Sequence, residues 1–342
     1  MKYKYPFFLA AFIMTLSSCS TDNADYPKPA VTGKIGEVLV VMDGRHWNSE
    51  AGDTLRSILE REYPMLPQIE KSFNVLHIEY SSFLPAMQRI RNIVMVTISD
   101  EYPTANVYKR KDPWATPQVL LSIVAPDVAQ AAKAMHDKRE TMLGILEQAE
   151  IDRQTRSAKI YADHEIGNAV LETFGVQVSV PKGYRIMNKK SDFIWIESRS
   201  NYSSTGIIIY TFPFDDINSI NPDFLINKCD DFLKKNVPGE RDSSRMTISK
   251  YVYPTIEIPK GADYIEMRGL WELVNDYMGG PFVTRFYIDA TNKKITAIKG
   301  YVYAPRYDKR DYLRRVEGIV NSFAFPGTMK RESDATDVDM NL

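Results

Sequence analysis

The chain has 342 residues, with 43 Lys and Arg against 44 Asp and Glu, which gives a formal net charge of −1. This balance offers no electrostatic basis for binding nucleic acid, so we expect no nucleic-acid partner. A composition of 44% hydrophobic and 25% charged residues is typical of a globular protein, and the length favours two domains.

The first nineteen residues have the pattern of a secretory signal that ends in a lipobox. Lys2 and Lys4 provide a positive start, residues 6–16 are almost entirely apolar, and Leu16-Ser17-Ser18-Cys19 places a cysteine after two small residues. A membrane-spanning helix needs roughly 20 apolar residues, so this run is too short to remain as an anchor. We therefore expect a signal peptide over residues 1–18 and lipidation of Cys19.

Lipid on Cys19 would make the membrane the first partner of this protein. Two or three acyl chains hold a protein to a bilayer almost irreversibly, and we expect a cell-envelope protein in the outer membrane that faces the periplasm. The alternative is an ordinary cleaved signal with a chance cysteine, which is disfavoured because the chain has only two cysteines. Residues 19–33 are polar, contain Pro27 and Pro29, and are expected to form a lipidated tether.

Residues 34–159 are expected to form the first domain. Apolar runs and helical periodicity predict its elements. They are a strand over 37–42, a helix over 49–62, strands over 73–80, 93–98 and 119–124, and a helix from 127 to 157 with a break near 153–157.

Residues 160–326 are expected to form the second domain, followed by a disordered tail over 327–342. The predicted elements are a helix over 163–174 that stops at Gly175, strands over 177–180, 193–197 and 206–212, a helix opened by Asn221-Pro222, an antiparallel meander over 264–275, 282–289 and 295–303, and a closing helix over 308–323. The fold class expected is α+β, with two domains that each carry a mostly antiparallel sheet flanked by helices, joined by a long helical segment.

Several short stretches, together with the lipobox, resemble an uncharacterised Bacteroidetes lipoprotein family known as a domain of unknown function. They are Leu66-Pro67-Gln68 with Glu70, Arg91-Asn92-Ile93, Trp114-Ala115 with Pro117-Gln118, Arg268-Gly269-Leu270-Trp271, Met278-Gly279-Gly280-Pro281-Phe282, and Tyr303-Ala304-Pro305 with Lys309-Arg310. The resemblance implies a location and no activity. The second half, with Pro181-Lys182-Gly183-Tyr184 and a last helix ending Asn321-Ser322-Phe323, is similar to the PsbP-like arrangement, which implies docking or assembly.

The loop over 43–47 is the first candidate site, because it follows an apolar strand at the place where α/β proteins commonly bind ligands. Asp43 and His46 could serve acid–base chemistry, with Trp47 beside them. The alternative interpretation is a common Asp-Gly turn with Trp47 as a core anchor. Arg91 precedes another apolar strand and would need a fixed partner if buried, for which Glu70 is a candidate.

The tyrosine-rich meander around Trp271, Gly279 and Gly280 is the second candidate, as a surface for a protein or glycan partner. Sheet packing and a hairpin turn are the structural alternatives. Cys229 lies on an apolar helical face and is expected to be a buried thiol. No metal or cofactor is expected, because the four histidines form no ligand pattern.

These observations favour a membrane-anchored binding or assembly module of the cell envelope over an enzyme. The alternative from another class is an envelope hydrolase that uses Asp43 and His46, and a structural spacer is a third. A deep pocket that joins those two side chains to Arg91 or Glu70 would favour the hydrolase. A shallow, exposed aromatic patch would favour the binding module.

Overall fold

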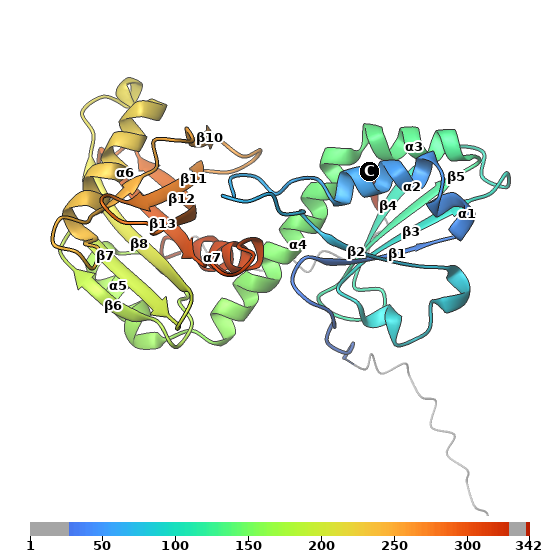
Figure 1. Cartoon of the computed structure of the whole chain (residues 1–342), viewed down its shortest axis with the longest axis horizontal. Coiled ribbons are helices and arrows are strands. Elements are labelled where there is room, and N and C mark those ends of the chain that lie inside the picture. Colours follow the sequence, from blue (N-terminus) through green and yellow to red (C-terminus); the bar gives the residue numbers. More distant parts are fainter. Residues whose placement is uncertain (1–26, 328–339) are drawn as a thin grey trace, which may run out of the picture.

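A computed structural model describes residues 27–327 and 340–342. It contains two sheets, each in its own domain, and one helix, α4 (Arg139–Ile160), that runs from the first domain into the second (Figure 1). The expected α+β, two-domain arrangement is confirmed. Within these residues no helix is both long and apolar enough to cross a membrane.

The first sheet has six strands in the order β14-β4-β5-β3-β1-β2. Their bounds are β1 (Glu37–Met42), β2 (Asn74–Ile78), β3 (Asn92–Ile98), β4 (Asn106–Lys111), β5 (Val119–Ala125) and β14 (Met340–Asn341). The pairs β1–β2, β1–β3 and β3–β5 are parallel, so the expectation of a mostly antiparallel first sheet is wrong. The unalternated apolar run of β1 is the signature of such a strand, because parallel strands are buried on both faces.

The two faces of the first sheet are covered differently. Helices α2 (Glu50–Leu59), α3 (Val128–Asp137) and the first half of α4 pack on one face (Figure 1). The other face carries a smaller cluster, closed by the segment over 79–91 and Trp114. That segment contains two short 3₁₀ helices, η1 (Tyr80–Ser82) and η2 (Met87–Arg89).

The predicted long helix is broken, but not where expected. The break falls at Lys138, between α3 and α4, whereas the predicted break near 153–157 lies inside continuous α4. The apolar period lapses in that stretch because Glu150 and Arg153 are buried there as a charged pair. A buried charged pair inside a helix and a true break in the helix therefore look alike in the sequence, because both interrupt the apolar period.

The second sheet is antiparallel throughout and confirms the predicted meander. Its order is β10-β11-β12-β13-β8-β7-β6, with β9 also paired to β11. The strands are β6 (Arg185–Lys189), β7 (Phe193–Arg199), β8 (Ser204–Pro213), β9 (Met246–Ile248), β10 (Thr255–Glu257), β11 (Ile265–Leu273), β12 (Gly279–Asp289) and β13 (Lys294–Tyr303).

Helices cover both faces of this second sheet. One face packs on α5 (His164–Phe174) and α7 (Arg310–Asn321), and the other on α6 (Pro222–Asn236). The predicted ends of α5 and α6 are confirmed: Gly175 ends α5 with φ +68°, and the Asn221 side chain accepts a hydrogen bond from the Phe224 N–H. A further 3₁₀ helix, η3 (Ile217–Ser219), precedes α6.

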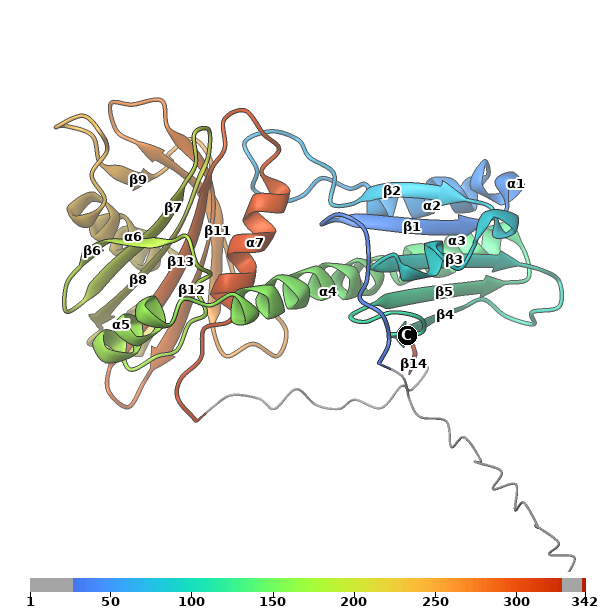
Figure 2. The same ribbon diagram turned by 90° about the horizontal axis from the view of Figure 1, so that it is seen from below.

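The two ends of the described chain both lie on the first domain (Figure 2). Ala30 and Thr32 form bridges to Thr116 and Ile90, so the end of the predicted tether over 19–33 is bound to the domain. The predicted disordered tail over 327–342 likewise differs at its end, where β14 pairs with β4. Cys19, the signal peptide and residues 328–339 lie outside the described residues.

Candidate functional site

The loop over 43–47 lies at the carboxyl edge of the parallel sheet. It forms a short helix, α1 (Gly44–Trp47), directly after β1. β1 pairs with β2 on one side and with β3 on the other, so this loop lies where the strand order reverses. Such a switch point is the usual ligand position in open α/β sheets.

Trp47 is held by two neighbours. Its ring stacks on the His77 imidazole at 4.4 Å between centroids, and the Arg56 guanidinium lies over it at 4.3 Å. Arg56 also donates a hydrogen bond from Nη1 to the Trp47 carbonyl oxygen at 2.9 Å. These contacts fix the loop against α2, as expected if Trp47 is a core anchor.

His46 is the residue of this loop whose side chain could act as an acid or a base. Its Nδ1 atom is buried and has no hydrogen-bond partner among the described residues. Burial lowers the pKa of His46, the Arg45 charge lowers it further, and Asp43 acts in the opposite direction. The Asp43 carboxylate pairs with Arg45 at 3.7 Å, and within the described chain no hydrogen bond joins it to the His46 ring, although the His46 backbone N–H donates to the Asp43 carbonyl oxygen at 3.0 Å. The loop therefore lacks the oriented acid–base pair that the hydrolase interpretation requires.

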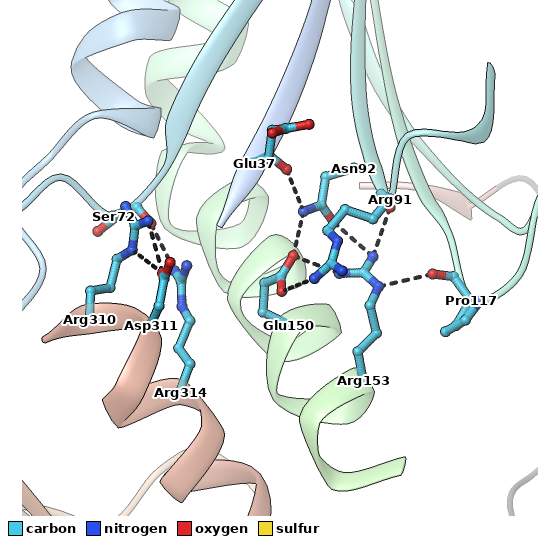
Figure 3. A network of polar contacts seen from close by, with 10 residues as sticks. All are labelled: Glu37, Ser72, Arg91, Asn92, Pro117, Glu150, Arg153, Arg310, Asp311 and Arg314. Carbon is cyan, nitrogen blue, oxygen red and sulfur yellow. Dashed lines mark hydrogen bonds and ion pairs between the residues drawn. The ribbon is translucent and has the colours of Figure 1, made fainter. Parts of the chain in front are cut away.

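Arg91 belongs to a buried charge cluster at the amino edge of the same sheet (Figure 3). Its Nη1 atom pairs with Glu150 Oε2 at 3.0 Å, so its partner is Glu150 and the predicted pairing with Glu70 is wrong. The fully buried Glu150 carboxylate also accepts hydrogen bonds from Arg153 Nη1 and Asn92 Nδ2, both at 2.8 Å. One carboxylate from α4 thus balances two arginines, Arg91 just before β3 and Arg153 of α4 itself.

Arg153 completes this cluster by binding backbone oxygens. It donates to the carbonyl oxygens of Pro117 and Arg91, at 2.9 and 2.7 Å, and to Asn92 Oδ1 at 2.9 Å. Burial lowers the pKa of Arg153 to about 10, and Glu150 opposes that shift. Most polar atoms of the cluster are engaged within the protein, although Arg91 Nε is buried without a partner among the described residues. The cluster therefore fastens α4 to the sheet and leaves little for a ligand.

Glu70 holds the two domains together. Its two carboxylate oxygens accept the backbone N–H groups of Lys309 and Arg310, at 2.7 and 2.9 Å, at the amino end of α7. A carboxylate stabilises a helix at this end by satisfying free N–H groups and the helix dipole. In return, Arg310 and Arg314 of α7 donate to the carbonyl oxygens of Lys71 and Ser72, at 2.6 and 2.9 Å. Figure 3 shows Arg314 beside Ser72.

A second set of contacts buries charge in the same interface. The Tyr63 hydroxyl of the first domain donates to Glu317 Oε2 of α7 at 3.0 Å, and Glu317 also pairs with Arg268 of β11. Burial raises the pKa of Tyr63, and the Glu317 charge adds to this effect. We call the contacts of residues 63–72 with α7 and Arg268 the domain junction.

Helices α4 and α7 approach closely beside the domain junction. A Cβ atom at Gly318 of α7 would lie 2.6 Å from the carbonyl carbon of Gln154 in α4. Only glycine allows this separation, because real Cβ atoms do not approach backbone so closely. The close approach is what lets α4 serve the second domain as well as the first (Figure 2).

Trp271, Gly279 and Gly280 lie inside the second sheet. Trp271 is 3% exposed, and its Nε1–H donates to the Val302 carbonyl oxygen at 3.1 Å. Gly280 is opposite Trp271, and a Cβ atom there would lie 2.1 Å from the same Val302 oxygen. These contacts are those of sheet packing. The exposed tyrosines of this half lie on loops, at Tyr161, Tyr202, Tyr251, Tyr253, Tyr277 and Tyr307.

Lys299 is a buried charged residue that no motif in the sequence indicated. It is fully buried against α6, its Nζ atom lies 2.8 Å from the centroid of the Phe282 ring, and it has no hydrogen-bond partner in the described chain. Burial lowers the pKa of Lys299 to about 7, against the opposing effects of Cys229 and Asp230. The sequence does contain a signal for this position: Lys299 and the apolar residues at every second position of β13 share the buried face of that strand.

Together these features define a two-domain α+β protein whose described residues hold no cluster of three metal-ligating side chains. Residues 163–322 match the model of a family described as Domain of unknown function (DUF4837). Residues 31–159 match a second family model, Domain of unknown function (DUF8532). The chain is thus similar over most of its length to two domains of unknown function, which supports that part of the resemblance inferred from its motifs.

No curated protein matches the chain. Among solved structures, the Ran-binding protein Mog1p of Saccharomyces cerevisiae is 9% identical, with a TM-score of 0.31, over 44% of this chain and 90% of its own. A mutant of the protein Mog1 matches with the same values. A similarity at this level carries no conclusion about fold or activity.

Proposed function

We propose that this protein is a lipid-anchored lipoprotein of the cell envelope that acts as a binding or assembly module. The lipobox ending in Cys19 supports the anchor. The family resemblance of its motifs supports a Bacteroidetes envelope lipoprotein in the outer membrane, facing the periplasm. A PsbP-like docking role of the second half belongs to the same proposal.

The domain junction is the observation that carries the binding or assembly role. Two domains with different sheets are fastened by the Glu70 cap of α7 and by the buried Tyr63, Glu317 and Arg268 contacts. Charged side chains that could have served chemistry are used to hold one domain on the other. A body built in this way presents a fixed surface to a partner, and pre-organisation of a surface favours binding.

The path of the chain gives this body an orientation relative to the proposed anchor. Thr32 joins the amino edge of the first sheet beside Ile90, whereas the loop over 43–47 lies at the opposite, carboxyl edge. The roughly ten residues between Cys19 and Pro29 can span at most about 35 Å. The amino edge would therefore face the membrane, and the carboxyl edge and its His46 would face away.

Fractionation of cells tests the anchor. We expect the wild-type protein in the membrane fraction and the Cys19→Ala variant in the soluble part of the envelope. Cys229→Ala is the matched control, because it removes the other cysteine, which is buried in the second domain. A Cys19→Ala variant that stays firmly in the membrane would contradict the anchor.

Crosslinking in cells, followed by identification of the captured proteins, tests the assembly role. We expect the wild-type chain to capture a reproducible partner and Glu317→Gln, which weakens the domain junction, to capture less of it while remaining membrane-bound. Absence of any reproducible partner would contradict the assembly role and leave the anchor intact.

A further inference from the structure

A polar groove lies where α4, α7 and the β7–β8 hairpin meet. It has a volume of about 340 Å³ and lies beside the domain junction, on the second domain. Helix α4 contributes Gln154 and Ser157, the hairpin contributes Ser198 and Ser204, and α7 contributes Tyr312 and Arg315. No sequence motif indicates this groove, because its residues are far apart in the sequence and of ordinary types.

The hydrogen-bonding groups of this groove are left free by the protein. Within the described residues, the side chains of Gln154, Ser157 and Ser198 have no hydrogen-bond partner. Ser204 lines the groove through its backbone, because it pairs with Arg199 and its side chain lies on the other face of the sheet, whereas Ser198 pairs with Thr205 on the groove side. Other hydroxyls of the lining are bonded to each other, as in the contact between Tyr184 and Thr205 at 2.8 Å. Three neutral polar groups are therefore available to a ligand with several hydroxyl groups.

A single positive charge stands on one side of the groove. Arg315 is exposed, and its guanidinium lies 5.7 Å from the centroid of the Tyr312 ring. No carboxylate of the described residues pairs with Arg315, and the lining includes no Asp or Glu. An unpaired guanidinium beside an aromatic face is suited to a carboxylate or phosphate on a ligand whose ring packs on the tyrosine.

We propose that this groove binds an acidic saccharide. The hydroxyl groups of the saccharide bond to Gln154, Ser157 and Ser198, one sugar face packs on Tyr312, and the acid group pairs with Arg315. An apolar ligand fits poorly because burying these free polar groups without partners is costly. A bare anion would use Arg315 alone and leave the three neutral groups without a role.

Calorimetric titration of the purified full-length chain, in a detergent without a sugar headgroup, tests the proposal. The probes are glucuronic acid, N-acetylmuramic acid, glucose and inorganic phosphate. We expect both acidic sugars to bind at least about tenfold more tightly than glucose or phosphate, because a charge-assisted hydrogen bond adds to the neutral ones.

Variants then locate the binding. Arg315→Gln should remove the preference for acidic over neutral sugars, and Tyr312→Ala should weaken both. Lys250→Gln, which removes one exposed charge from another part of the domain, should bind as the wild type does, and unchanged melting temperatures would show that the variants fold. Equal affinity for phosphate and the acidic sugars, no saturable binding, or binding unaffected by Arg315→Gln would each overturn the proposal.

Discussion

The buried Lys299 makes a sharp prediction about stability and pH. The structure gives its amine a pKa of about 7, against a usual value of 10.5, because burial disfavours the charged form. This difference of about 3.5 pH units corresponds to roughly 5 kcal/mol, at about 1.4 kcal/mol per unit. The unfolded chain keeps the lysine proton up to about pH 10.5, whereas the folded chain releases it near pH 7. Lys299 therefore destabilises the fold by the full amount below pH 7, and this cost declines as the pH rises toward 10.5.

The substitution Lys299→Met removes the amine and keeps an unbranched side chain of similar length. We expect the variant to be more stable than the wild type by up to about 5 kcal/mol at pH 6 and by only about 2 kcal/mol at pH 9. Urea denaturation followed by tryptophan fluorescence at both pH values measures this difference. Lys250→Met, at an exposed position, is the control and should change stability little at either pH. A stability gain that is equal at pH 6 and pH 9 would refute the reasoning.

Two further predictions concern the junction and the second sheet. Glu317→Gln should destabilise the chain by about 3 kcal/mol in urea denaturation, because it removes the buried carboxylate that pairs with the partly buried Arg268; an unchanged midpoint would mean that this pair contributes nothing. Gly280→Ala should destabilise the fold by about 1–3 kcal/mol and so lower the melting temperature, because the new Cβ atom would meet the Val302 oxygen. Gly144→Ala, in α4 with open space around it, should raise the melting temperature by the equivalent of roughly 0.5–1 kcal/mol, and shifts of the same sign in both glycine variants would contradict this account.

Local signals were sufficient wherever structure depends on near neighbours in the chain. The Asn221-Pro222 start of α6 and the Gly175 end of α5 depend on residues within one helical turn, and both were predicted correctly. The meander was predicted because its strands follow one another with short connections. Edge strands such as β6 were missed, because a mostly exposed strand needs no apolar alternation.

Partners distant in the sequence could not be found in this way. Glu70 accepts a hydrogen bond from the N–H of Lys309, which lies 239 residues later in the sequence. Arg91 pairs with Glu150, which lies 59 residues later. Several carboxylates were equally plausible partners for Arg91 when only residue types were known. The parallel direction of the first sheet was missed for a related reason, because strand direction depends on crossovers and not on the pattern within a strand.

Helix α4 makes the two cores share one element. Its first half supplies Met142 and Leu146 to the first core, and its last turns supply Ala158 to the second. If either core unfolded, α4 would lose part of its apolar packing, and the other core needs the same helix. We expect both halves to melt in one cooperative step, and a single cut in the backbone of α4 to release both, even though the chain has the outline of two separable units.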